Sequence, residues 1–116
     1  MQKLDLIDLQ RHLEEVISNA FEKPCWVRAE INHLAVRNGH CYMELVQKDE
    51  QTDRLLAKAQ AVIWAGNYAL LEPYFRTSTG MHLAVGLQVL LSVVPRMHPL
   101  YGLSLTVTNI DPSYTI

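Results

Sequence analysis

The chain has 116 residues, which is enough for one domain built around one hydrophobic core. Its two cysteines are too few for a disulfide framework, and no apolar run approaches the roughly 20 residues of a membrane span. With 49% hydrophobic residues the chain is expected to fold, and it carries no signal-peptide pattern. We therefore expect a cytoplasmic protein that makes no contact with a membrane.

The charges are few and unevenly placed. The formal net charge is −2, from 10 basic and 12 acidic residues, which is unfavourable for binding phosphate groups. Residues 1–22 hold five acids and two bases, whereas residues 54–110 hold four bases and one acid. Any contact with nucleic acid is therefore expected to be local, and the binding weak.

The first predicted element is an amphipathic helix. Apolar residues recur at spacings of three and four, at Leu6, Leu9, Leu13, Val16, Ile17 and Ala20. Asp5 is placed to be the N-cap, and Pro24 prevents the helix from continuing.

From Cys25 onward the hydrophobic period changes to two, which predicts strands. The first strand is followed by Asn38-Gly39, a strong hairpin signal, and by a second strand with inward Cys41, Met43 and Leu45. The polar run 48–54 predicts an exposed loop. A third strand reaches about residue 64, with one face formed by Ala57, Ala59, Ala61 and Ile63.

The second half of the chain predicts one short helix and two more strands. Gly66-Asn67 ends the third strand, and a short helix follows over residues 68–75, limited by Pro73. Residues 77–80 are read as a turn, and residues 81–94 as a long strand with a bulge or bend at Gly86. A second hairpin loop over residues 95–102 leads into a last strand over residues 101–110.

This order of elements is that of the oligonucleotide-binding (OB) fold, a five-stranded Greek-key barrel. Each strand has one apolar face and no large helical layer to cover it, so the sheet must curl on itself. We therefore predict a single all-β domain, with a leading helix within residues 1–22 and an OB barrel within residues 23–116.

Four segments in the right order carry a family resemblance. They are Trp26-Val27-Arg28-Ala29-Glu30-Ile31-Asn32, Asn38-Gly39-His40-Cys41-Tyr42-Met43-Glu44-Leu45, Ala61-Val62-Ile63-Trp64-Ala65-Gly66-Asn67, and Gly80-Met81 followed by a long Val/Leu strand. Together they resemble the N-terminal OB domain of the exodeoxyribonuclease VII large subunit, over nearly the whole chain.

The resemblance implies a function and its partners. In that family this domain binds single-stranded DNA and feeds it to a separate nuclease domain, and the large subunit pairs with several copies of a small helical subunit. The chain would then be a piece without the catalytic part, not itself an enzyme and without a cofactor, of an exodeoxyribonuclease that hydrolyses phosphodiester bonds.

The expected nucleic-acid site is the outer face of the second and third strands with its flanking loops. The candidate contacts, from the three first strands and the two hairpin loops, are Arg28, Asn32, Arg37, His40, Tyr42, Lys58, Gln60, Trp64, Arg96 and Tyr101. Trp64 is the expected stacking platform, the alternative being that it packs on the helix over residues 68–75. For His40 a structural hydrogen bond is favoured over a DNA contact, and Trp26 is expected to pack against the leading helix.

The residues give little support to catalysis or metal binding. Cys25, His33, His40 and Cys41 match no zinc spacing, and alternation points His40 outward and Cys41 inward. Glu30 and Glu44 fall on adjacent strands, but two carboxylates on a solvated face are more often incidental than catalytic. We therefore expect no catalytic residue and no metal site.

A different class of function stays open, because OB barrels also serve as protein-interaction modules. Gln60 and Ala65 stand where the family often has basic residues, which favours this alternative. It predicts an exposed apolar patch, with the acidic helix over residues 5–20 as a docking element, either inside a longer subunit or between copies of the fragment.

Overall fold

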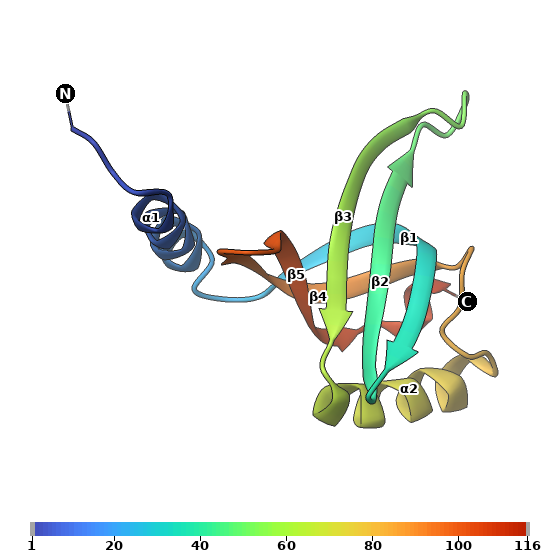
Figure 1. Cartoon of the computed structure of the whole chain (residues 1–116). Coiled ribbons are helices and arrows are strands. Elements are labelled where there is room, and N and C mark those ends of the chain that lie inside the picture. The colour runs from blue at the N-terminus through green and yellow to red at the C-terminus, as the bar shows by residue number, and fades with distance from the viewer. Residues whose placement is uncertain (1, 116) are drawn as a thin grey trace.

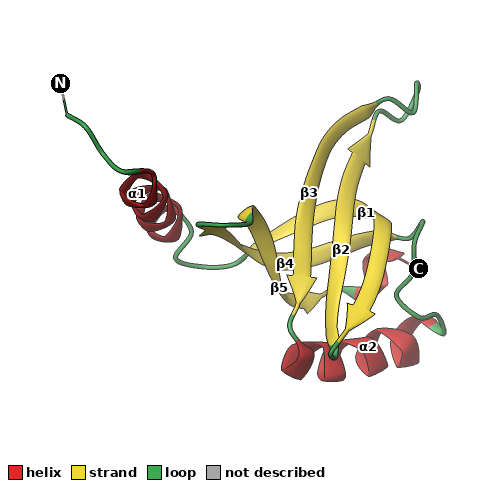
Figure 2. Ribbon diagram, viewed as in Figure 1, coloured by secondary structure: helices red, strands yellow, loops and turns green. Residues whose placement is uncertain are grey.

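A computed structural model describes residues 2–115 and shows five strands closed into a barrel in the order β1-β2-β3-β5-β4 (Figures 1 and 2). Neighbouring strands are antiparallel except β3 and β5, which are parallel. The elements are α1 (Leu6–Ala20), β1 (Cys25–Arg37), β2 (His40–Lys48), β3 (Leu55–Ile63), α2 (Ala65–Thr79), β4 (Gln88–His98), β5 (Gly102–Ile110) and α3 (Pro112–Thr115). The five-stranded OB barrel with a leading helix is thereby confirmed, and only the short α3 had no counterpart in the sequence prediction.

The barrel interior is filled by the inward side chains that the period of two singles out. Cys41, Met43 and Leu45 of β2 are all buried, as the alternation predicts. Leu71 and Phe75 of α2 join the same cluster, and α2 lies across one end of the barrel (Figure 1). Helix α2 thus covers the core where the sheet leaves it open.

Strand β1 is long because it serves two neighbours. Its first half pairs with β4 and its second half with β2, and Glu30 pairs with both. The register shifts between Ile31 and His33, so Asn32 is an extra residue in a bulge. A bulge bends the strand, which lets one strand close both sides of the barrel.

The hairpin of β2 and β3 extends beyond the barrel (Figure 1). Ala61 and Ile63 in the second half of β3 are buried, but Ala57 is exposed and Ala59 only half-buried. The prediction of a continuous buried alanine face was therefore wrong in its first half. The apolar–polar alternation is present in the sequence, but the side chains of the projecting part of the strand are largely exposed to solvent.

Helix α2 is nearly twice as long as the sequence indicated. Strand β3 does end at Ile63, but the helix begins directly after Trp64 and continues through Pro73 to Thr79. Asn67, read as part of a break, donates from its side-chain amide to the β5 carbonyls of Val107 and Thr108, at 3.2 and 3.1 Å. The contact with β5 anchors the first turn of the helix.

The segment after α2 is a loop, so the strand predicted over residues 81–94 was wrong in its first half. Strand β4 begins at Gln88. Gly86 has φ of +93° and donates its N–H to the carbonyl of Ile31 at 2.7 Å. The bend predicted at Gly86 is therefore real, but it is a turn ahead of the strand, and its left-handed conformation favours glycine.

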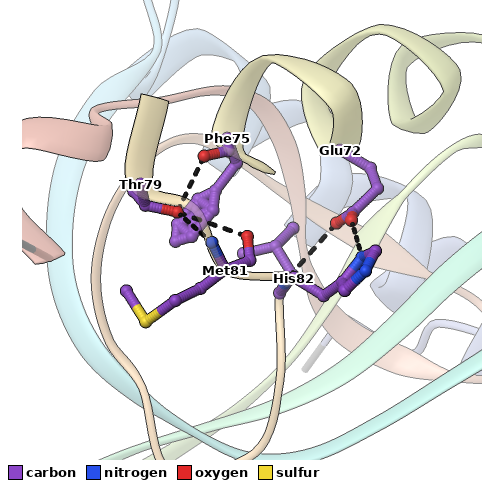
Figure 3. A network of polar contacts seen from close by, with 6 residues as sticks. Glu72, Phe75, Thr79, Met81 and His82 are labelled. Carbon is purple, nitrogen blue, oxygen red and sulfur yellow. Dashed lines mark hydrogen bonds and ion pairs between the residues drawn. The ribbon is translucent and has the colours of Figure 1, made fainter. Parts of the chain in front are cut away.

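Side chains of α2 hold this loop in place (Figure 3). The Thr79 hydroxyl donates to the Phe75 carbonyl at 2.8 Å and accepts from the Met81 N–H at 3.0 Å. A carboxylate oxygen of Glu72 lies 2.8 Å from Nδ1 of His82. These contacts satisfy the loop's polar groups locally, so its Leu and Val residues do not extend the strand.

Strand β4 continues into the predicted second hairpin loop and ends at His98. The loop is only residues 99–101, because Pro95 pairs with Leu105 of β5 inside the ladder. Pairing between β4 and β1 stops at Val93, so Pro95 lies where β4 has a neighbour on one side only. Such a position tolerates proline, which explains why it does not end the strand.

Helix α1 lies to one side of the barrel and contacts it chiefly through β4 (Figure 1). Glu14 accepts from the Met97 N–H at 2.7 Å, and its carboxylate lies 3.8 Å from the guanidinium of Arg96. All 15 residues of α1 are exposed or half-buried. Trp26, expected to pack against this helix, is 52% exposed. Within residues 2–115, no helix has the length and apolar character needed to cross a lipid bilayer.

Stability is expected to fall in alkaline solution because of Cys41. Burial, with the Glu72 carboxylate acting in the same direction, raises the pKa of this thiol from 9.0 to about 11. Between these values the unfolded chain loses the thiol proton and the folded chain keeps it, so the free energy of unfolding falls by about 1.4 kcal/mol per pH unit. Urea denaturation at pH 9, 10 and 11, which span this interval, measures the fall. Cys41→Ala should be less stable but should lack this part of the slope, and equal slopes in both proteins would contradict the assignment.

Candidate nucleic-acid interface

One end of the outer face of β2 and β3 carries three rings and a guanidinium group that we call the stacking cluster: Arg37, His40, Tyr42 and Trp64. The centroid of the His40 ring lies 5.1 Å from that of Trp64, and the Tyr42 and Trp64 centroids are 6.3 Å apart. The rings meet edge to face, and Trp64 remains 48% exposed. The Arg37 guanidinium carbon lies 4.8 Å from the centroid of the Tyr42 ring, in cation–π geometry.

The cluster is assembled by a strand end, a hairpin and a helix start. Arg37 ends β1, and His40 and Tyr42 open β2 directly after the Asn38-Gly39 turn. Trp64 comes from the N-cap position of α2. Residues 24 positions apart in the chain are therefore fixed side by side by the pairing of β2 with β3.

His40 makes the structural hydrogen bond that was favoured for it. Its Nδ1 accepts the N–H of Ala65, the first residue of α2, at 2.9 Å. A helix leaves its first amides without partners, and here a side chain from β2 supplies one. His40 thereby ties the start of α2 to the same strand that carries Tyr42.

The middle of the face is a polar network centred on Glu44. Oε1 accepts from the amide of Asn32 at 2.9 Å, and Oε2 accepts from that of Gln60 at 3.5 Å. The bond from Asn32 is the largest cause that lowers the pKa of Glu44, and the charges of Lys58 and His33 act in the same direction. The network thus keeps an ionised carboxylate in the centre of a face proposed from sequence for phosphate-bearing chains.

The far end of the face carries a second carboxylate with its own partners. Glu30 lies 3.1 Å from the Lys48 ammonium and accepts from the Gln88 amide at 3.1 Å. Glu30 and Glu44 therefore each have separate hydrogen-bond partners. Among residues 2–115, no three His, Cys, Asp or Glu side chains gather as a metal site.

The predicted site residues fall into two sets. Those on or beside the outer face of β2 and β3 are Asn32, Arg37, His40, Tyr42, Lys58, Gln60 and Trp64. Arg28 is exposed on the half of β1 that pairs with β4. Arg96 faces Glu14 of α1, and Tyr101, 81% exposed in the hairpin loop, stacks on His98 with centroids 4.5 Å apart.

Sequence reasoning missed two members of the face. Glu44 was weighed only as half of a catalytic pair, and His33 only as a metal ligand. The bulge at Asn32 is what shifts His33 opposite Glu44 in the register. Alternation alone had no signal for this bulge, although a polar Asn-His pair within an apolar strand marks the place.

Comparison with known proteins agrees with the OB fold described above. A family model described as an OB-fold nucleic acid binding domain matches residues 4–111. The chain is 40% identical over 119 residues to the exodeoxyribonuclease 7 large subunit of Deinococcus radiodurans, a match that covers 99% of this chain and 28% of that protein. The match is to the N-terminal part of that subunit, which confirms the resemblance carried by the four segments.

A solved structure shares the fold. The crystal structure of the mitochondrial single-stranded DNA binding protein Rim1 from S. cerevisiae matches with a TM-score of 0.51 at 10% identity, over 77% of this chain and 91% of that one. At this identity the likeness concerns the fold alone. The closed barrel has the OB topology, and the family model matches nearly the whole chain. The chain therefore belongs to the family of OB-fold nucleic acid binding domains.

Proposed function

We propose that this domain binds single-stranded DNA across the outer face of β2 and β3, and that the stacking cluster is its principal contact. The observation that carries the proposal is the half-exposed Trp64 held edge to face against His40 and Tyr42 on this face. Bases stack on exposed aromatic rings, and because every base has a π-face such binding tolerates many sequences.

The charges of the face support a modest, salt-sensitive affinity. Arg37 lies over Tyr42, so its guanidinium can meet the phosphate next to a base stacked in the cluster. Lys58 on β3 adds a second positive charge to this face, while Glu44 and Glu30 oppose it. Stacking therefore carries more of the binding than phosphate contacts do.

In a full-length subunit the role would be delivery of the strand. The chain spans 28% of the relative it matches, and that relative is named as the large subunit of an exodeoxyribonuclease. We place the domain as the part that presents single-stranded DNA to a separate nuclease domain, in an enzyme that hydrolyses phosphodiester bonds together with its small subunit. The domain itself needs no cofactor for this role.

A titration of fluorescein-labelled single-stranded DNA at several salt concentrations tests the proposal. Each phosphate contact contributes about −0.7 to the slope of log affinity against log salt. With Arg37 and Lys58 as the two contacts we expect a slope of about −1.4, and we expect Arg37→Gln to weaken binding and make the slope less steep by about 0.7. Arg11→Gln on α1 removes the same charge far from the face and should leave the slope unchanged. No binding at low salt and high protein concentration would contradict the proposal.

A second candidate function is assembly through α1. Its apolar stripe is open to solvent, with Leu6, Leu9 and Val16 exposed by 71%, 44% and 50%. We propose that a second copy of the chain covers this stripe when the domain is alone. Sedimentation velocity should then show a dimer that Leu9→Asp dissociates without weakening DNA binding, whereas a monomer at all concentrations would remove this candidate.

A further inference from the structure

The outer face of β2 and β3 is hollowed between Tyr42 and Glu44. This open pocket has a volume of about 310 Å³ and is lined by residues of β1, β2 and β3: His33, Leu34, Ala35, Tyr42, Met43, Glu44 and Gln60. A volume of this size has room for one planar ring. The pocket lies beside the stacking cluster, since Tyr42 belongs to both.

The walls of the pocket differ in chemistry from one side to the other. Tyr42 offers an aromatic ring and Ala35 an exposed methyl group, whereas Met43 is buried in the barrel core and Leu34 packs against that core. The opposite side is polar, with Glu44 and Gln60 joined by a hydrogen bond of 3.5 Å. A ring that packs on the tyrosine would therefore direct one polar edge toward a carboxylate.

Glu44 is held in place as an acceptor. Its strong bond comes from Asn32 at 2.9 Å, and the bond from Gln60 is long. An ionised carboxylate has about four lone-pair sites and no proton to donate, so it can accept further hydrogen bonds and can offer none. A partner that brings an N–H group gains from this position, and one that brings a carbonyl oxygen is repelled.

We propose that this pocket seats one nucleobase, and that Glu44 makes it select bases that carry an exocyclic amino group. This inference rests on the proposed binding of single-stranded DNA. Cytosine, adenine and guanine each carry an exocyclic amino group that can donate to Glu44, whereas thymine and uracil carry none and have a carbonyl oxygen where cytosine has its amino group. Glu44 is thus a residue that determines which bases the pocket accepts.

Cytosine and uracil make the sharpest pair of probes, because they share ring size and differ chiefly in the exocyclic group. Fluorescein-labelled 15-residue strands of dC and of dU are titrated at pH 7.5 with the chain and with Glu44→Gln. We expect the wild-type chain to bind dC about tenfold more tightly than dU, the scale of one hydrogen bond to a charged group. In Glu44→Gln the ratio should fall close to one, mainly through tighter binding of dU, since the glutamine amide can donate to its carbonyl oxygen.

Glu50→Gln is the matched control, because it removes the same charge from an exposed residue of the β2–β3 loop. It should leave the ratio of dC to dU affinity as it is in the wild-type chain. Equal binding of both strands by the wild-type chain, or a change in Glu44→Gln by the same factor for both, would overturn the base pocket while leaving the binding of single-stranded DNA intact. Failure of the wild-type chain to bind either strand would overturn the proposed function and this inference with it.

Discussion

Replacing Trp64 with alanine is expected to weaken binding of single-stranded DNA by about tenfold or more, because stacking of a base on an aromatic ring is worth roughly 1–3 kcal/mol. The ring is 48% exposed and is fixed in orientation by His40 and Tyr42, so little of its stacking is lost to disorder. Fluorescence anisotropy with a labelled oligonucleotide measures the change. Trp64→Phe keeps a smaller ring and should lose less affinity than Trp64→Ala.

The chain contains its own control for this experiment. Trp26 is the other tryptophan, is 52% exposed, and lies on the half of β1 that pairs with β4. Trp26→Ala removes the same ring from a different surface and should leave the affinity within about twofold of the wild-type value. An equal loss of DNA affinity in both variants would show that any exposed aromatic ring contributes to binding wherever it lies. That result would contradict the assignment of the binding site to the outer face of β2 and β3.

The largest effect on stability is expected from Phe75→Ala, which should lower the free energy of unfolding by about 3–5 kcal/mol. Phe75 is fully buried where α2 crosses the end of the barrel, in one cluster with Ile31, Met43 and Leu91. Removing the ring leaves a cavity that neighbouring strands, tied into a closed sheet, cannot readily collapse. Urea denaturation followed by circular dichroism gives the value.

Tyr74→Ala is the matched control for the core variant. Tyr74 is the preceding residue of the same helix and is 50% exposed. Its replacement changes the same turn of the helix without removing a buried ring. We expect it to cost less than about 1 kcal/mol. A cost for Phe75→Ala no greater than this would contradict the role of α2 as the cover of the barrel.

The fold class could be predicted because the sequence shows two hydrophobic periods without interruption. One is the period of two in the strands, and the other is the spacing of three and four in α1. The period of two singled out Cys41, Met43 and Leu45, and all three are buried. The stripe with spacings of three and four predicted α1 with its bounds, because amphipathicity depends on local sequence alone.

The boundaries in the second half could not be predicted because tertiary contacts override local signals there. Pro73 argued for a short helix, but Asn67 anchors its first turn to β5 and Thr79 satisfies its end. Pro95 argued for a loop, but it lies beyond the pairing with β1. The β5 partners of Asn67 and the strand neighbours of Pro95 are distant in sequence, and only the bond of Thr79 is local.

The aromatic part of the candidate site was predictable, as were the positions of Asn32, Lys58 and Gln60, but the hydrogen-bond network around Glu44 was not. Tyr42 and Trp64 share an outward register across paired strands, so their proximity follows from alternation. The network of Glu44 depends on the bulge at Asn32, which alternation does not reveal. The pairing of Arg96 with Glu14 depends on where α1 docks, and a helix stripe does not specify its partner.

The most direct test of the central claim is a two-dimensional ¹H–¹⁵N NMR titration of the chain with an unlabelled single-stranded oligonucleotide. The two tryptophans give two indole N–H signals, assigned with Trp64→Phe, and each reports on a different surface. We predict that the Trp64 indole and the amides of β2 and β3 around Tyr42 and Glu44 shift with increasing DNA, while the Trp26 indole and the amides of α1 stay in place. Shifts confined to Trp26 and α1, or no shifts at saturating DNA, would contradict the claim that this face of the barrel holds the strand.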